Sequence, residues 1–183
     1  MNAMIDTRTL KRAALTEALA DVVLAEGVDA LSLRPAAARL GTSDRMLLYY
    51  FGTKAELVQD VLACIAGRFS VYLASTTNNS RIPPQNMVGH TANAMSSPKG
   101  RPFLQVWLEI AARAGRGDPA FIDVARDIGE FWNDWIVRSV HFPHGVTPRN
   151  AAAMMLAIVN GITLLDLSSP KVGEAARSRV QNA

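Results

Sequence analysis

The residues best placed for chemistry lie in a short polar break, Gly41-Thr42-Ser43, between two runs of helical apolar spacing. Thr42 and Ser43 offer hydroxyl groups where the second run begins. A helix N-terminus also presents free backbone N–H groups, which bind anions and above all phosphates. The break is therefore suited to holding a phosphate, and the elements on either side must position it.

Two short helices, over residues 33–40 and 44–50, are predicted to flank the break. Ala36 and Ala37 are small enough for the second helix to cross the first closely, and Gly41 permits the tight turn. Leu47 and Phe51 are expected to face inward. This arrangement is typical of a helix-turn-helix, whose second helix enters the DNA major groove. A helical hairpin inside an ordinary bundle is the alternative.

The stretch 31–57 favours the helix-turn-helix, because it resembles the DNA-binding domain of TetR-family regulators. It reads LSLRPAAARLGTSDRMLLYYFGTKAEL. Ser32, the pair Ala36-Ala37, Gly41, Ser43 and Leu47 match the family pattern in order and without a gap. Tyr50-Phe51 and the run from Lys54 to Leu57 complete the match, and the similarity extends over roughly residues 10–60.

The resemblance implies that Tyr50 and Lys54 contact the DNA backbone. Arg45 departs from the small residues common in the family, and its guanidinium is the best candidate to read guanine by a bidentate contact. The alternative for Arg45 is an ion pair with Asp44 or Glu56, and for Lys54 a solvated side chain. In full, the candidate DNA-binding residues are Arg34, Thr42, Ser43, Asp44, Arg45, Met46, Tyr49, Tyr50 and Lys54.

An all-α fold is predicted for the whole chain. Beyond the two short helices, apolar periodicity and proline or glycine at the ends give helices over residues 7–26, 54–75, 86–95, 102–114, 119–140, 148–167 and 172–180. We expect an N-terminal three-helix helix-turn-helix domain over residues 1–53. A C-terminal helical domain, for ligand binding and dimerisation, is expected over residues 54–183.

Large residues of the C-terminal part could line a pocket for an apolar small molecule, since Met and aromatic side chains suit one. Such residues at helical spacing are more often simply core. The candidate ligand-binding residues are Met87, Met95, Phe103, Trp107, Phe131 and Trp135.

Residues 151–167 are nearly apolar all round, so the helix they form must be covered on several sides. Asn160, Thr163 and Asp166 interrupt the run, and a membrane span needs about 20 mainly apolar residues. We therefore expect a buried helix and no membrane partner. The resemblance implies that this run and residues 172–180 form a homodimer interface, with Ala153, Ala157, Gly161 and Leu164 as the candidate contacts.

The composition adds exclusions. The 183 residues contain a single Cys, which rules out an intramolecular disulfide and fits a reducing cytoplasm. The net charge of +3 does not point to DNA, because residues 1–68 hold eight basic and eight acidic side chains. The sequence contains no recognisable catalytic motif. The glycine pattern at residues 115–120 resembles a dinucleotide-binding fingerprint, but such a fingerprint must follow a strand, and here a predicted helix precedes it.

We therefore expect no enzymatic activity, no cofactor and no metal. The expected function is that of a cytoplasmic regulator that binds double-stranded operator DNA as a dimer and is released by an apolar effector. The alternative is a helical small-molecule-binding or interaction protein that does not bind DNA.

Overall fold

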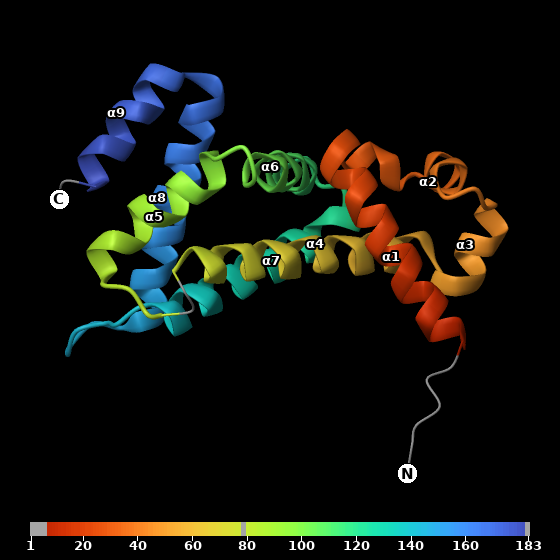
Figure 1. Cartoon of the computed structure of the whole chain (residues 1–183), viewed down its shortest axis with the longest axis horizontal. Helices are drawn as coiled ribbons and strands as arrows, with labels where there is room; N and C mark the ends of the chain where they lie inside the picture. The colour runs from red at the N-terminus through yellow and green to blue at the C-terminus, as the bar shows by residue number, and fades with distance from the viewer. Residues whose placement is uncertain (1–6, 78–79, 182–183) are drawn as a thin grey trace, which may run out of the picture. The chain divides into compact units, whose positions relative to one another are not determined.

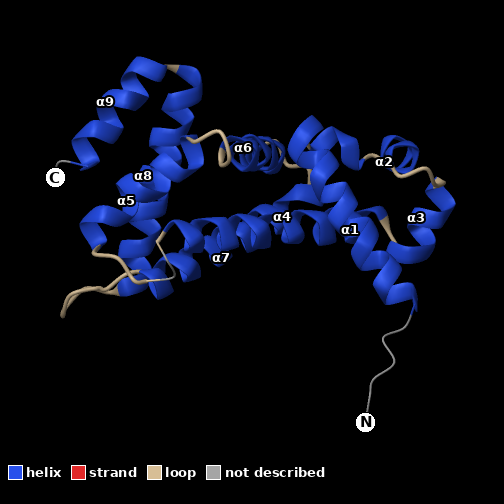
Figure 2. Cartoon of the chain, viewed as in Figure 1, coloured by secondary structure: helices blue, strands red, loops and turns tan. Residues whose placement is uncertain are grey.

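Helices form the regular structure of residues 7–77 and 80–181, the part of the chain that this computed structural model describes (Figure 2). In that part, the only strand-like feature is an isolated bridge between Ile82 and Val140. The prediction of an all-α fold is confirmed. In chain order (Figure 1), the elements are α1 (Thr7–Glu26), the 3₁₀ helix η1 (Val28–Leu31), α2 (Leu33–Arg39), α3 (Asp44–Phe51), α4 (Lys54–Thr76), α5 (Pro84–Ser96), α6 (Arg101–Gly115), α7 (Pro119–Ser139), α8 (Pro148–Ser168) and α9 (Pro170–Gln181).

The helix positions follow the sequence prediction closely, and the differences lie at the ends. The helix α1 has the predicted bounds, whereas α5 and α9 each begin two residues early, at Pro84 and Pro170. Proline fits the first helical position because the N–H it lacks would have no partner inside the helix there. Residues 28–31, which lie between the first two predicted helices, form η1.

Side chains cap the N-termini of α3 and α4, but not those of α2 and α8. Ser43 accepts a hydrogen bond from the backbone N–H of Met46, and Thr53 accepts one from that of Glu56. Ser32 and Thr147 occupy N-cap positions, but the side chain of neither makes a capping hydrogen bond.

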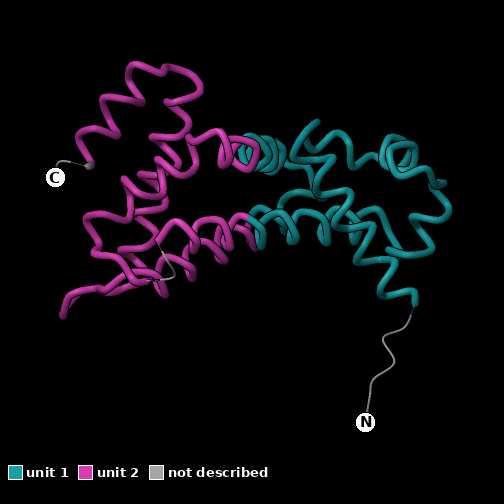
Figure 3. Tube along the Cα trace, in the orientation of Figure 1, with its two compact units in different colours: residues 1–68, 105–125 teal, residues 69–104, 126–183 magenta. Residues whose placement is uncertain are grey.

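The chain forms two compact units, and neither is continuous in sequence (Figure 3). Unit 1 comprises residues 1–68 and 105–125, and unit 2 comprises residues 69–104 and 126–183. This division by contacts differs from the boundary expected at residue 53, because α4, α6 and α7 each contribute to both units. The boundary at residue 53 marks the end of the helix-turn-helix and remains a prediction.

Unit 1 is built around a buried stripe on α1. Leu15, Leu19 and Val23 recur every four residues and are at most 8% exposed. The helix α1 contacts η1 and α3, while α2 contacts η1 and α3 in turn. These contacts hold the two short helices, which could not be stable alone at seven and eight residues.

Unit 2 is organised by α5, which packs against both α8 and α9. Met87, Ala92 and Met95 of α5 are buried there. The Asp166 carboxylate of α8 accepts a hydrogen bond from the Ser96 hydroxyl and pairs with Arg177 of α9 at 3.3 Å. These contacts join the three helices at one corner of the unit.

The helix α8 departs from the expectation of a buried helix. Its buried residues are Ala152, Val159, Ile162 and Thr163, which share one face of the helix. Its other face stays open, with Met154 64% exposed. By length and composition alone, α4 and α8 are the two helices of the described residues that could cross a membrane.

Candidate DNA-binding surface

The turn between α2 and α3 is fixed by backbone hydrogen bonds and one glycine. The N–H of Thr42 donates to the Ala37 carbonyl at 3.0 Å, and Gly41 has a φ of +61°, which an L residue rarely adopts. Ser43 then caps α3, with 3.3 Å between its Oγ and the Met46 nitrogen. The start of α3 is thus held in place before any DNA is present.

One face of α3 is anchored in the core, which leaves the other face free. Leu47 is fully buried and Phe51 is 1% exposed, as the sequence predicted. Ala36 and Ala37 of α2 are buried as well. The remaining surface of α3 is exposed and carries Asp44, Arg45, Met46, Leu48 and Tyr49, of which Arg45, Met46 and Tyr49 lie opposite the buried side.

The structure exposes most of the nine candidate DNA-binding residues. Arg34 of α2 and Lys54 of α4 are exposed, as are the residues of the α3 face. Thr42 and Tyr50 are half-buried. Within residues 7–77 and 80–181, neither Arg34 nor Arg45 nor Lys54 forms an ion pair. The alternative in which Arg45 pairs with Asp44 or Glu56 is therefore not what the protomer adopts.

Other arginines of unit 1 are neutralised by acids within the unit. Arg39 binds Glu26 through two nitrogens, with the shortest contact at 2.7 Å, and these hydrogen bonds hold the pKa of the Glu26 carboxyl below its usual range. Arg12 pairs with Asp60, and Arg68 pairs with Glu17 and Asp21. None of these ion pairs involves the basic candidates Arg34, Arg45 and Lys54. The equal count of bases and acids in this part of the chain therefore does not describe how its basic side chains are paired.

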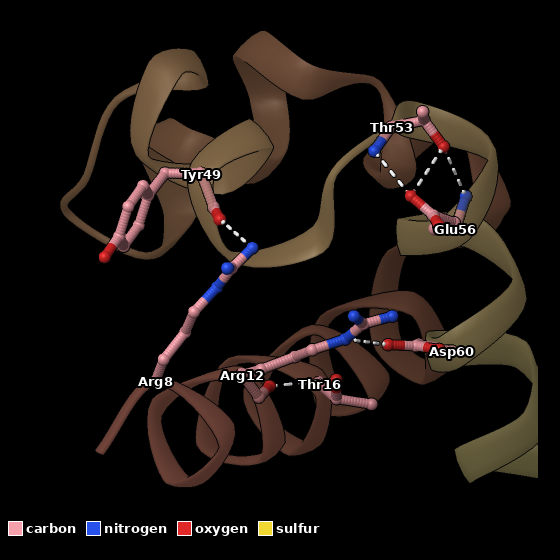
Figure 4. A network of polar contacts seen from close by, with 7 residues as sticks. All are labelled: Arg8, Arg12, Thr16, Tyr49, Thr53, Glu56 and Asp60. Carbon is pink, nitrogen blue, oxygen red and sulfur yellow. Dashed lines mark hydrogen bonds and ion pairs between the residues drawn. The ribbon is translucent and has the colours of Figure 1, made fainter. Parts of the chain in front are cut away.

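A capping box fixes the N-terminus of α4 beside the recognition segment (Figure 4). The Glu56 carboxylate accepts a hydrogen bond from the Thr53 N–H at 2.8 Å, and the Thr53 hydroxyl accepts one from the Glu56 N–H at 3.1 Å. This reciprocal pair satisfies two backbone donors. It also occupies Glu56 and leaves Lys54, at the first helical position, pointing to solvent.

Sequence reasoning missed one contact at this surface, between Arg8 of α1 and Tyr49 of α3 (Figure 4). The Arg8 Nη2 donates to the Tyr49 carbonyl oxygen at 2.8 Å, and the guanidinium lies over the tyrosine ring. The two residues are 41 positions apart, and no local spacing rule connects them.

The candidate ligand-binding residues are only partly brought together. Phe103, Phe131 and Trp135 belong to one aromatic cluster of unit 2, while Met87 and Met95 are buried in α5 of the same unit. Trp107 belongs to unit 1.

The centre of the aromatic cluster is a pair of residues outside the candidate set. The Phe69 ring stacks on Phe103 at 4.9 Å between centroids and meets Trp132 edge-on at 5.1 Å. Trp132 in turn contacts Phe131 and Trp135. An aromatic residue on the expected 54–75 helix was the available signal for Phe69.

The candidate dimer residues share one exposed face of α8. Ala153, Ala157, Gly161 and Leu164 are all exposed. Met154 and Ile158 lie on the same face and are 64% and 41% exposed. In the protomer, this face is therefore an apolar stripe open to solvent.

The family comparison fits this geometry. Residues 15–61 match the model of the bacterial regulatory proteins of the tetR family. Over these residues, the chain is similar to that family. The match spans α1, η1, α2, α3 and the start of α4, which are the elements that build the exposed α3 face. No curated protein matches the sequence significantly.

Solved structures of TetR-family regulators share this fold over most of the chain. A TetR-family regulator from Rhodococcus sp. superimposes with a TM-score of 0.74 at 20% identity, over 94% of this chain and 95% of the other. One from Cytophaga hutchinsonii gives 0.75 at 14% identity, over 98% and 96%. The multidrug binding protein EbrR complexed with proflavin gives 0.63 at 22% identity, over 94% and 98%. At these identities the similarity concerns the fold.

Proposed function

We propose that this protein is a cytoplasmic transcriptional repressor that binds a palindromic operator as a homodimer and is released by a small apolar molecule. The observation that carries the proposal is the α3 face. It presents Arg45 and Tyr49 to solvent from a helix fixed on its other side by Leu47 and Phe51.

The DNA contacts divide into base reading and phosphate binding. Arg45 lies in the first turn of α3, the part of a recognition helix that reaches base edges in the major groove. A guanidinium there can donate two hydrogen bonds to one guanine. Ser43, Tyr50 and Lys54 lie at or beyond the ends of α3 and are assigned to the phosphates on either side.

The proposed dimer uses the exposed face of α8. Small residues at positions 153, 157 and 161 recur every four residues, so a second helix can approach closely along them. Pairing two copies through this face would bury Met154, Ile158 and Leu164, which a single protomer leaves in water. A twofold dimer presents two α3 helices, which accounts for a palindromic operator.

The proposed effector site is the aromatic cluster around Phe69 and Trp132. Stacked and edge-on rings offer flat apolar surfaces that suit an aromatic or otherwise apolar ligand. The likeness to EbrR, which was solved with proflavin, supports this ligand class. Release from DNA then requires only that the ligand bind more tightly to a conformation in which the α3 helices no longer match the operator spacing.

Binding of the purified protein to the DNA flanking its own gene tests the proposal. We expect a dimer in solution and tight binding that weakens steeply with added salt, because Lys and Arg release counterions from phosphates. A reporter driven by that DNA should be silenced by the protein. Absence of both a dimer and DNA binding would contradict the proposal and favour a helical ligand-binding protein.

A further inference from the structure

The C-terminal end of α3 receives its positive charge from another helix. The last turn of α3 contains no basic residue, and its carbonyl groups have no partner further along the helix. Arg8 of α1 supplies what is missing, since its Nη2 donates to the Tyr49 carbonyl at 2.8 Å. A cation is favourable at this end of a helix because the helix dipole is negative there.

The same guanidinium also holds the Tyr49 side chain. Its central carbon lies 5.1 Å from the centre of the Tyr49 ring, within the range of a cation–π contact. The Tyr49 and Tyr50 rings also meet edge to face, with 5.1 Å between centroids. Tyr49 is 57% exposed, so these two contacts restrict a ring that solvent alone would leave free to change rotamer.

Arg12, one turn further along α1, secures the buried side of the same helix end. Its guanidinium lies 5.5 Å from the centre of the Phe51 ring, and its Nε donates to Asp60 of α4 at 2.6 Å. The side chain of Arg8 extends from α1 toward Tyr49 of α3, and that of Arg12 extends toward Asp60 of α4 (Figure 4). Two arginines four residues apart thus fix the end of α3 from its exposed and its buried side.

We propose that Arg8 is a positioning residue for operator recognition, which acts by holding Tyr49 and the end of α3 in the orientation that reads DNA. This inference rests on the proposed function. It assigns Arg8 an effect on sequence preference that a simple phosphate contact would not have.

The test compares R8A with K11A by measuring affinity for the operator and for unrelated DNA across a series of salt concentrations. Both changes remove one positive charge from the same turn of α1, and Lys11 is exposed. We expect R8A to lower the ratio of operator to unrelated affinity by roughly five- to tenfold, with an unchanged salt dependence. We expect K11A to leave that ratio unchanged.

Three further variants keep the inference falsifiable. R8K should restore part of the preference, since an ammonium can donate to the carbonyl or lie over the ring but lacks the planar fork that does both. In a Y49A background, the effect of R8A on the ratio should shrink. Circular dichroism of R8A and R8K checks that each variant is folded, and R8Q replaces R8A if it is not.

Two different results would overturn the inference. Equal weakening of both DNAs by R8A, with the salt slope reduced by about one, would make Arg8 a phosphate contact. An unchanged ratio would show that it has no role. If the wild-type protein itself shows no operator preference, the proposed function fails, and the inference falls with it for that separate reason.

Discussion

Arg45 is the residue whose environment makes the sharpest prediction about sequence reading. It is exposed in the first turn of α3 and forms no ion pair within the described residues. Replacing it with alanine should cost about 1–3 kcal/mol of operator affinity and relax the preference at one base pair of each half-site. Binding to a panel of operators, each with one base pair changed, measures this directly.

Lys54 provides the comparison for Arg45, because it carries the same charge but lies at the start of α4. K54A should weaken binding to every operator in the panel alike and reduce the salt slope by about one. If R45A also weakened all sequences equally, Arg45 would be a phosphate contact, and base reading would have to come from other residues of the α3 face.

At the scale of elements, α6 contributes to the fold of the helix-turn-helix unit through η1. The Glu109 carboxylate accepts a hydrogen bond from the Val28 N–H at 2.8 Å and lies against Gly27. One turn later, Arg113 pairs with Asp29 of the same 3₁₀ helix. Residues 105–125 therefore belong to unit 1, although they lie far along the chain from its other segment, residues 1–68.

Gly27 is the position where this contact should be most sensitive. Its φ of +89° and ψ of 175° fall in a region that is essentially restricted to glycine, and an added Cβ would lie 2.8 Å from a Glu109 oxygen. We expect G27A to lower the free energy of unfolding by about 1–3 kcal/mol, measured by urea denaturation. G41A is the matched control, since Gly41 also has a positive φ but open space around it. Its cost should be smaller, and equal costs would mean that Glu109 simply moves aside.

The sequence predicted what depends on neighbours along the chain and missed what depends on distant ones. The bounds of α1, the buried Leu47 and Phe51 and the cap at Ser43 follow from periodicity and local hydrogen bonding, so they could be read directly. Glu109 and Val28 are 81 residues apart, and Arg8 and Tyr49 are 41 apart. No periodicity specifies such pairs, because the packing of helices against one another decides them.

At the scale of the molecule, the total charge is less informative than its pairing. Arg12, Arg39 and Arg68 bind acids of their own unit, whereas the candidate contacts Arg34, Arg45 and Lys54 form no ion pair within residues 7–77 and 80–181. The net charge of residues 1–68 is zero, which by itself suggests no anionic partner. Only the structure shows which basic side chains lack an acidic partner within the described residues, and Arg34, Arg45 and Lys54 are among them.

The open face of α8 provides the final prediction. A Cβ at Gly161 would have no neighbour within 4 Å in the protomer, so a large side chain there should leave the monomer folded. If a second copy approaches along the small residues of this face, G161W should hold the two helices apart. We expect the variant to sediment as a monomer and to lose most of its operator affinity, while keeping its helical circular dichroism.

G129W is the matched control for G161W, because Gly129 lies mid-helix in α7 with the same open space. A dimer that survives G161W would place the interface on another surface and leave the exposed Met154 and Ile158 without a role in self-association.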